Sequence, residues 1–283
     1  MISIITDSDS SLPNDLAQRY GIKQVPITIQ FGEDIYKTNI EIDDHKLFER
    51  IDKEGKLPTT AAPSPGDFAE AYREAFEQDK ADTLICFCVS SEISGTYNAA
   101  KLAAEEYSKK KRIEVVDTRS LTMGQGYMAI MAAEQVREGQ TVEKIIAAAH
   151  ALRERTHVYG ALSTLKYLSM SGRVSHLAAG MAGMLHIKPI LAVQNGKLDL
   201  IEKVRTRRKA WARIVELVKR DVGSSRVERM CFLHVAAEEE AQEFKQRLQA
   251  SVKCPDDTPF IPLTPGLSVH TGAGLVGVAF IVE

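Results

Sequence analysis

The 283-residue sequence lacks the features that mark a membrane protein, a secreted precursor or a zinc protein. It has no apolar stretch of 18 or more residues, and the run from Met1 to Ile5 reaches Asp7 without a basic region or a cleavage-like site. We therefore expect a cytoplasmic protein without stable membrane insertion. The four cysteines form no C-x-x-C pair and have no histidine at zinc-finger spacing, so we expect no metal site.

Excess charge of either sign is also missing. Lys and Arg total 36 against 38 Asp and Glu, which gives a formal charge of −2 and a pI near 6.4. This balance argues against nucleic acid as a partner. The sequence contains neither G-x-x-x-x-G-K-[ST] nor G-x-G-x-x-G, which argues against an enzyme that binds nucleotides through those loops.

What the sequence does contain is an ordinary globular composition, with 44% hydrophobic and 26% charged residues. In the first two-thirds, short strand-like runs alternate with helical patterns, which is typical of a mostly parallel sheet covered by helices on both faces. The runs are Met1–Ile5, Val25–Phe31, Thr83–Val89 and Ile113–Val116. Ser64, Pro65 and Asp67 together predict the start of a helix.

The pattern changes after a helical segment from Thr141 to Arg155. Beyond it, Asn195-Gly196 lies between two apolar runs and predicts a β-hairpin. Strands near Arg229–Val235 and Leu275–Val282 flank a helix at Glu238–Ala250. We predict an α/β protein with an N-terminal α/β domain (residues 1–155) and a C-terminal α+β domain with a mixed sheet (residues 156–283).

Small hydroxylated residues follow two of the predicted strands. Ser94, Gly95 and Thr96 lie between the strand Thr83–Val89 and a helical stretch. Backbone N–H groups at a helix N-terminus favour an anion, so this loop is either an anion site or an ordinary serine-rich helix cap. The segment from Thr6 to Ser11 is similarly a turn with a helix cap or a ligand contact.

A further hydroxylated segment runs from Thr59 to Pro65 and precedes another helix start. Parallel α/β folds gather such loops at one edge of the sheet, so we expect the Thr60 and Ser94 loops to converge. His270 lies before the last apolar strand, among glycines that permit close backbone approach. A lone histidine is either a ligand contact or a satisfied structural residue.

The ordered set of these segments resembles the DegV family from end to end. The matching segments are Thr6-Asp7-Ser8, Thr60 through Pro65-Gly66, Ser90-Ser91 through Ser94-Gly95-Thr96-Tyr97, Asp117-Thr118, Gly172-Arg173-Val174-Ser175, Lys188-Pro189-Ile190-Leu191 and His270-Thr271-Gly272. The resemblance implies a two-domain fold with an apolar lipid tunnel between or adjoining the domains. It also implies a long-chain fatty acid as ligand, with no cofactor.

By the same resemblance, Thr60, Ser94, Gly95 and His270 form a polar loop site that holds the fatty acid carboxylate. Several members of the family present the acid to a fatty acid kinase, which makes the acyl phosphate. A kinase and an acyltransferase are therefore the expected partners, and the chain needs no catalytic motif of its own. The resemblance assigns Arg173 to docking on the kinase.

Three positions depart from the family pattern. Ala61-Ala62 replaces a frequent Ser-Gln and removes polar groups beside the threonine, while Ser171 and Ala273 replace a frequent glycine and a frequent proline. Arg205 and Arg208, in the basic run Lys203–Lys209, are candidate partner or phosphate contacts, or part of a solvated face. The apolar segment Val174–Ile187 is a candidate tunnel wall or a plain buried helix.

The main alternative is a serine-dependent lipid or ester hydrolase. Ser94, a later acid and His270 occur in the order of a catalytic triad, but no G-x-S-x-G surrounds Ser94.

Overall fold

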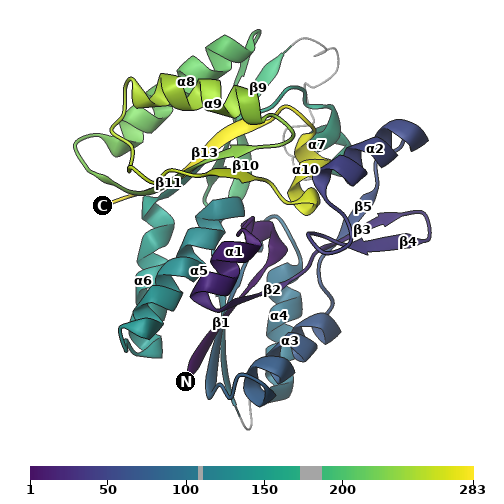
Figure 1. The fold of residues 1–283 in the computed structure, drawn as a ribbon, viewed down its shortest axis with the longest axis vertical. Helices are drawn as coiled ribbons and strands as arrows, with labels where there is room; N and C mark the ends of the chain where they lie inside the picture. The colour runs from purple at the N-terminus through teal and green to yellow at the C-terminus, as the bar shows by residue number, and fades with distance from the viewer. Residues whose placement is uncertain (108–110, 173–186) are drawn as a thin grey trace.

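The computed structural model describes residues 1–107, 111–172 and 187–283 and arranges them around two main β-sheets (Figure 1). The first sheet is parallel throughout. Its strands are, in spatial order, β2 (Ile22–Val25), β1 (Ile2–Asp7), β6 (Thr83–Cys88) and β7 (Arg112–Asp117). The short 3₁₀ helix η1 (Ser8–Ser10) follows β1.

Helices cover both faces of this sheet because its strands are apolar on both sides. Ile4 and Ile85 pack with α1, α5 and α6, while Ile5 and Cys86 pack with α3 and α4. These helices are α1 (Asn14–Tyr20), α3 (Pro65–Glu77), α4 (Thr96–Tyr107), α5 (Thr122–Arg137) and α6 (Val142–Arg155). The predicted parallel, doubly covered sheet is confirmed, and α3 begins with a capping box between Ser64 and Asp67.

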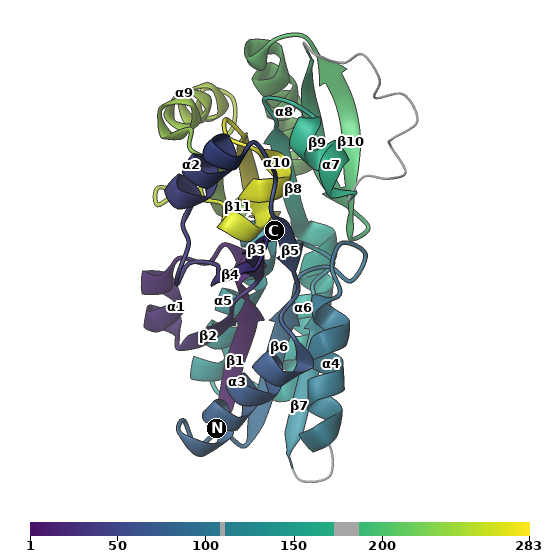
Figure 2. The ribbon, with the colours of Figure 1, turned by 90° about the vertical axis from the view of Figure 1, so that its right-hand side faces the viewer.

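The second sheet is mixed, as predicted. Its strands are, in spatial order, β10 (Lys197–Val204), β9 (Lys188–Gln194), β8 (Thr156–Ala161), β13 (Val276–Val282), β11 (Val227–His234) and β12 (Phe260–Pro262). Neighbours are antiparallel except β11 and β12. Helices α8 (Arg207–Val222) and α9 (Glu238–Gln249) pack Trp211 and Phe244 on one face, and the other face meets α5 (Figure 2).

The predicted β-hairpin connects β9 to β10. Asn195 and Gly196 have φ values of 51° and 81°, the left-handed pair that a type I′ turn requires.

A small third sheet corrects two sequence predictions. Val25–Phe31 is not one strand, because Pro26 has no N–H for the ladder and the chain leaves β2 to begin β3 (Thr28–Phe31) in another sheet. Thr60 lies in β5 (Thr59–Ala61) rather than in a loop. Strand β3 pairs with both β5 and β4 (Asp34–Lys37).

Three short helices lie next to this third sheet and complete the fold. They are α2 (Asp44–Glu54), α7 (Lys166–Ser171) and α10 (Pro265–Thr271), and α10 contacts both of the others. Figure 2 shows α10 between α2 and the second sheet.

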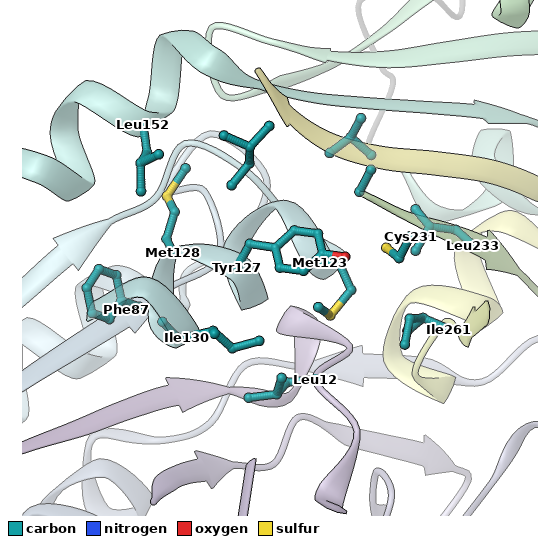
Figure 3. Close-up of a cluster of buried hydrophobic side chains, with 14 of the residues drawn as sticks. Leu12, Phe87, Met123, Tyr127, Met128, Ile130, Leu152, Cys231, Leu233 and Ile261 are labelled. Carbon is teal, nitrogen blue, oxygen red and sulfur yellow. The ribbon is translucent and has the colours of Figure 1, made fainter. Parts of the chain in front are cut away.

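One continuous apolar core joins the two main sheets. Met123 and Tyr127 of α5 lie toward Cys231 and Leu233 of β11 in this core (Figure 3). The predicted division between residues 155 and 156 falls where α6 ends and β8 begins. The core crosses this point, and the division into two domains stays a prediction.

No helix among the described residues is long and apolar enough to cross a membrane.

Two glycines that face each other in β8 and β13 provide a test of this packing. Gly277 pairs with Gly160, but a Cβ at Gly277 would lie 2.4 Å from the Tyr159 carbonyl oxygen. A Cβ at Gly160 would meet nothing closer than Leu275, at 3.6 Å.

We expect Gly277→Ala to lower the free energy of unfolding by about 2 kcal/mol. Gly160→Ala should change it by less than about 1 kcal/mol in the same urea denaturation. Equal stability of the two variants would contradict this account.

Candidate functional site

The structure joins two of the predicted site residues directly. Thr60 Oγ1 lies 3.0 Å from His270 Nε2, and the two side chains are partly buried. The residues are 210 positions apart in the sequence and come from β5 and α10. The prediction that the site consists of loops is wrong for both, because Thr60 is on a strand and His270 on a helix.

Helix α10 is held in place on three sides. Pro265 begins it with a preset φ, and Val269 packs into a small core with Ile29 and Leu47. One residue before Val269, the Ser268 hydroxyl donates to the Asp44 carboxylate of α2 over 3.0 Å. These contacts fix the direction in which α10 presents His270.

His270 lies where an apolar cavity meets a more polar hollow. The cavity has a volume of about 70 Å³, within about 650 Å³ of empty space that includes its opening to solvent. Its apolar lining comprises Ile93, Leu121, Val158, Gly160, Leu162, Leu168, Leu191, Ala192, Val193, Leu198, Leu233, Leu263, Leu267 and Leu275. Thr122, Tyr159, His270 and Thr271 complete it. The hollow, of about 1000 Å³, is lined by His270 together with Thr60, Thr59, Lys56 and Ser171 among others.

The long wall of the cavity is the inner face of the second sheet. Side chains alternate between the two faces of a strand, so Val158, Gly160 and Leu162 share the face toward the first sheet. Leu191 and Val193 of β9 continue that face. This wall escaped the sequence interpretation, because β9 is apolar on both faces and its sequence does not mark the side of the cavity.

Ser94 approaches the same cavity from the first sheet. Its neighbour Ile93 lines the cavity, while the Ser94 hydroxyl lies 2.8 Å from the hydroxyl of Thr96. The Ser94 oxygen also accepts from the Thr96 N–H over 3.3 Å, as in a helix cap. Gly95 is exposed, and a Cβ there would have no neighbour within 4 Å. Ser94 is thus near the cavity wall, and its described hydrogen bonds are those of a cap.

The segment Thr6-Asp7-Ser8 is a structural junction. Asp7 is fully buried and accepts hydrogen bonds from the Val89 N–H at 2.8 Å and the Gln125 amide at 3.0 Å. These bonds connect the end of β1 to β6 and α5. Burial raises the pKa of the Asp7 carboxyl to about 6 despite these donors.

The predicted arginines do not join the cavity in the described part of the chain. Arg205 and Arg208 are exposed near the start of α8, which packs on the outer face of the second sheet. Arg173 and most of the predicted tunnel segment Val174–Ile187 lie outside the described residues.

The described residues contain no group of three or more His, Cys, Asp or Glu side chains placed to hold a metal ion. Cys86 and Cys88 are free and buried, with their sulfur atoms 3.8 Å apart.

Comparison with known proteins gives one consistent family. The family model described as "Uncharacterised protein, DegV family" matches residues 1–283. A DegV domain-containing protein from Deinococcus radiodurans is 34% identical over 98% of this chain and 97% of its own length. This chain is therefore similar to full-length relatives.

Two solved structures extend the similarity to three dimensions. A DegV family protein from Thermus thermophilus, described by its fatty acid binding, has a TM-score of 0.91 and 32% identity, with 100% of this chain and 99% of that chain covered. DegV from Bacillus subtilis, described as a fatty acid binding protein, has a TM-score of 0.86, 30% identity and the same coverage.

Burial of the Asp44 carboxyl leads to a prediction about the pH dependence of stability. Burial is the main cause that raises the pKa of the Asp44 carboxyl, to about 7. A folded-state pKa above the unfolded value makes stability fall as pH rises through that value. We expect the free energy of unfolding to lose roughly 2 kcal/mol from this group between pH 5 and pH 8.

Asp44→Asn should remove that loss. The free energy of unfolding of the variant, relative to that of the wild type, should therefore be higher at pH 8 than at pH 5. Urea denaturation of both proteins at each pH measures the difference. Asp7 also titrates in this range, so the wild type alone does not isolate Asp44. The difference in free energy of unfolding between the two proteins is therefore compared at the two pH values. A parallel pH dependence in the two proteins would refute the assignment to Asp44.

Proposed function

The chain belongs to the DegV family, and from that premise we propose that it binds a long-chain fatty acid. The hydrocarbon lies in the apolar cavity, and the carboxylate lies beside Thr60 and His270. The observation that carries the proposal is that His270 lines both the apolar cavity and the adjoining hollow. A fatty acid has the same division into an apolar chain and a charged end.

The energetics support this placement. Each buried methylene contributes about 0.8 kcal/mol, and the cavity wall is almost entirely aliphatic. A carboxylate next to such a wall needs hydrogen-bond donors, because an unpaired buried charge is strongly unfavourable. With His270 Nε2–H donating to the Thr60 oxygen, the Thr60 hydroxyl hydrogen can be donated to the carboxylate beside the cavity.

Ser94 and Gly95 complete the proposed carboxylate site. The support is the position of Ile93 on the cavity wall, which puts the following hydroxyl and N–H groups next to the same space. On binding, the Ser94 hydroxyl turns from Thr96 to the carboxylate. Ser94 acts as a hydrogen-bond donor in this proposal.

We further propose that the chain is a carrier that presents the fatty acid to a fatty acid kinase and then to an acyltransferase. Arg173, Arg205 and Arg208 are the proposed contacts for the partner or for the phosphate. Arg205 and Arg208 are exposed, and no carboxylate among the described residues lies within ion-pair distance of either. Their neighbour Arg207, in contrast, pairs with Glu240 at 2.8 Å.

A cytoplasmic location stays a prediction.

Lipid retention tests the binding proposal. The protein purified after bacterial expression should carry one fatty acid per chain in native mass spectrometry. Thr60→Ala combined with Ser94→Ala should reduce the lipid-bound fraction at least tenfold, because two hydrogen bonds to a charged group are lost. Thr59→Ala is the matched control, since it removes an exposed hydroxyl from the adjacent position of β5. Equal retention by the double variant and the control would defeat the proposal.

The hydrolase alternative makes an opposite prediction. A triad requires a base at the serine hydroxyl, whereas the Ser94 hydroxyl pairs with Thr96 and His270 Nε2 with Thr60. We expect a fluorophosphonate probe to leave Ser94 unlabelled, as judged by peptide mass spectrometry against a serine hydrolase standard. Labelling that disappears in Ser94→Ala would restore the hydrolase.

A further inference from the structure

A second hollow, separate from the cavity mouth at His270, lies along the junction of the two main sheets. We call it the arginine hollow. It has about 1270 Å³ of empty space, including its opening. Its lining comes from the β7–α5 connection, α6, β8, the β9–β10 hairpin and α8. The ionisable residues of the lining are Arg119, His150, Arg153, Glu154, His157, Arg220 and Asp221.

Two guanidinium groups in the arginine hollow, the exposed Arg119 and the half-buried Arg153, form no ion pair with a carboxylate among the described residues, although the Asp117 carboxylate attracts Arg153 from beyond ion-pair distance. Arg119 donates to the carbonyl oxygen of Asn195, and Arg153 donates to the carbonyl oxygen of Asp117. Arg153 is half-buried, and its Nε is buried without a partner among the described residues. A half-buried guanidinium normally has an anionic partner, so this arrangement calls for an anion.

The carboxylates of the hollow do not fill that need. Asp221, whose side chain is only 10% exposed, accepts from the Tyr159 hydroxyl and pairs with Arg220 at 2.8 Å and His157 at 3.4 Å. Glu154 is exposed at the edge of the hollow. Burial lowers the pKa of the Arg153 guanidinium, the Asp117 carboxylate opposes that change, and the charge of Arg119 adds to it.

The backbone around the arginine hollow is packed firmly enough to hold these groups in place. The Ser90 hydroxyl donates to the Gly196 carbonyl over 2.6 Å, and a Cβ at Gly196 would lie 2.7 Å from that hydroxyl. The hairpin turn of the second sheet therefore fits against Ser90 and Arg119 of the first. The hollow does not depend on a loop that must close.

We propose that the arginine hollow binds a phosphate group, either as inorganic phosphate or as the phosphoryl end of a small molecule. Guanidinium forks match the oxygen geometry of phosphate, and His150 and His157 add ring N–H donors from α6 and β8. The recess is bounded by a turn and two helices, which suits a small ligand. The bound anion contacts Arg119 and Arg153 from one side of the junction and His157 from the other.

The position of the arginine hollow connects it to the lipid cavity. Val158, Tyr159 and Val193 line both spaces, so β8 and β9 form a shared wall. A phosphate that bridges Arg119 of the β7–α5 connection and His157 of β8 stabilises that wall. The proposal stands on its own contacts and does not require that the cavity hold a fatty acid.

Thermal unfolding of the full chain with inorganic phosphate tests the proposal, with sodium chloride at equal ionic strength as reference. A ligand at about ten times its Kd should raise the Tm by about 2 °C above the reference. The same measurement with methyl phosphate distinguishes inorganic phosphate from a phosphorylated small molecule as the ligand. Stronger binding of the ester indicates a phosphorylated small molecule, and stronger binding of the free ion indicates inorganic phosphate. No shift with either anion overturns the proposal.

Arg119→Gln and Arg153→Gln should each weaken phosphate binding at least tenfold. The matched control is Arg73→Gln, which removes an exposed arginine of α3 outside the hollow and should leave phosphate binding unchanged. Equal weakening by the control would mean that phosphate acts through general charge.

Histidine NMR of the wild-type protein locates the site without any variant. Ring Hε1 signals of His150 and His157 should move on phosphate addition and saturate together. Movement of the His270 signal alone would mean that phosphate occupies the carboxylate site, and would overturn the assignment to the arginine hollow.

Discussion

The hydrogen bond between Thr60 and His270 is the contact on which the candidate site depends. It joins a strand of the small third sheet to α10, the helix between β12 and β13 of the second sheet in the chain. Helix α10 is fixed by Val269 in the small core and by the bond from Ser268 to Asp44, so the ring of His270 has a defined position. Without that support, the polar edge of the cavity would have no fixed donor.

The cavity is a local exception within a well-packed core. The two main sheets share one apolar cluster, and most of its side chains fill the space between them. Where the wall consists of Gly160 and of leucines from several strands, the same apolar surface encloses empty volume instead. The proposed acyl chain would lie against this apolar surface. In that proposal, fold stability and ligand binding depend on the same surface.

Much of the fold was predictable from the sequence, because the signals are local. The capping box at Ser64 and the Asn195-Gly196 turn depend on residues within a few positions of each other. The break at Pro26 was also readable, since proline cannot donate to a strand ladder, yet Val25–Phe31 was predicted as one strand. The doubly covered parallel sheet followed from apolar runs and their spacing.

The site was predictable only in part. The resemblance of the ordered segments to the DegV family suggested that Thr60, Ser94 and His270 form one site. In the structure, Thr60 and His270 are in contact. The bond from Ser268 to Asp44 joins residues 224 positions apart, and no local pattern marks it. The arginine hollow likewise gathers side chains from five parts of the chain. Such groupings arise from tertiary packing, which composition and periodicity do not encode.

The proposed fatty acid site can be checked in a crystal structure of the protein with its co-purified lipid. We expect one acyl chain along Val158, Gly160 and Leu191, with its carboxylate within hydrogen-bond distance of Thr60 Oγ1 and His270 Nε2. A chain bound elsewhere, or one reversed so that its carboxylate lies away from His270, would contradict the account.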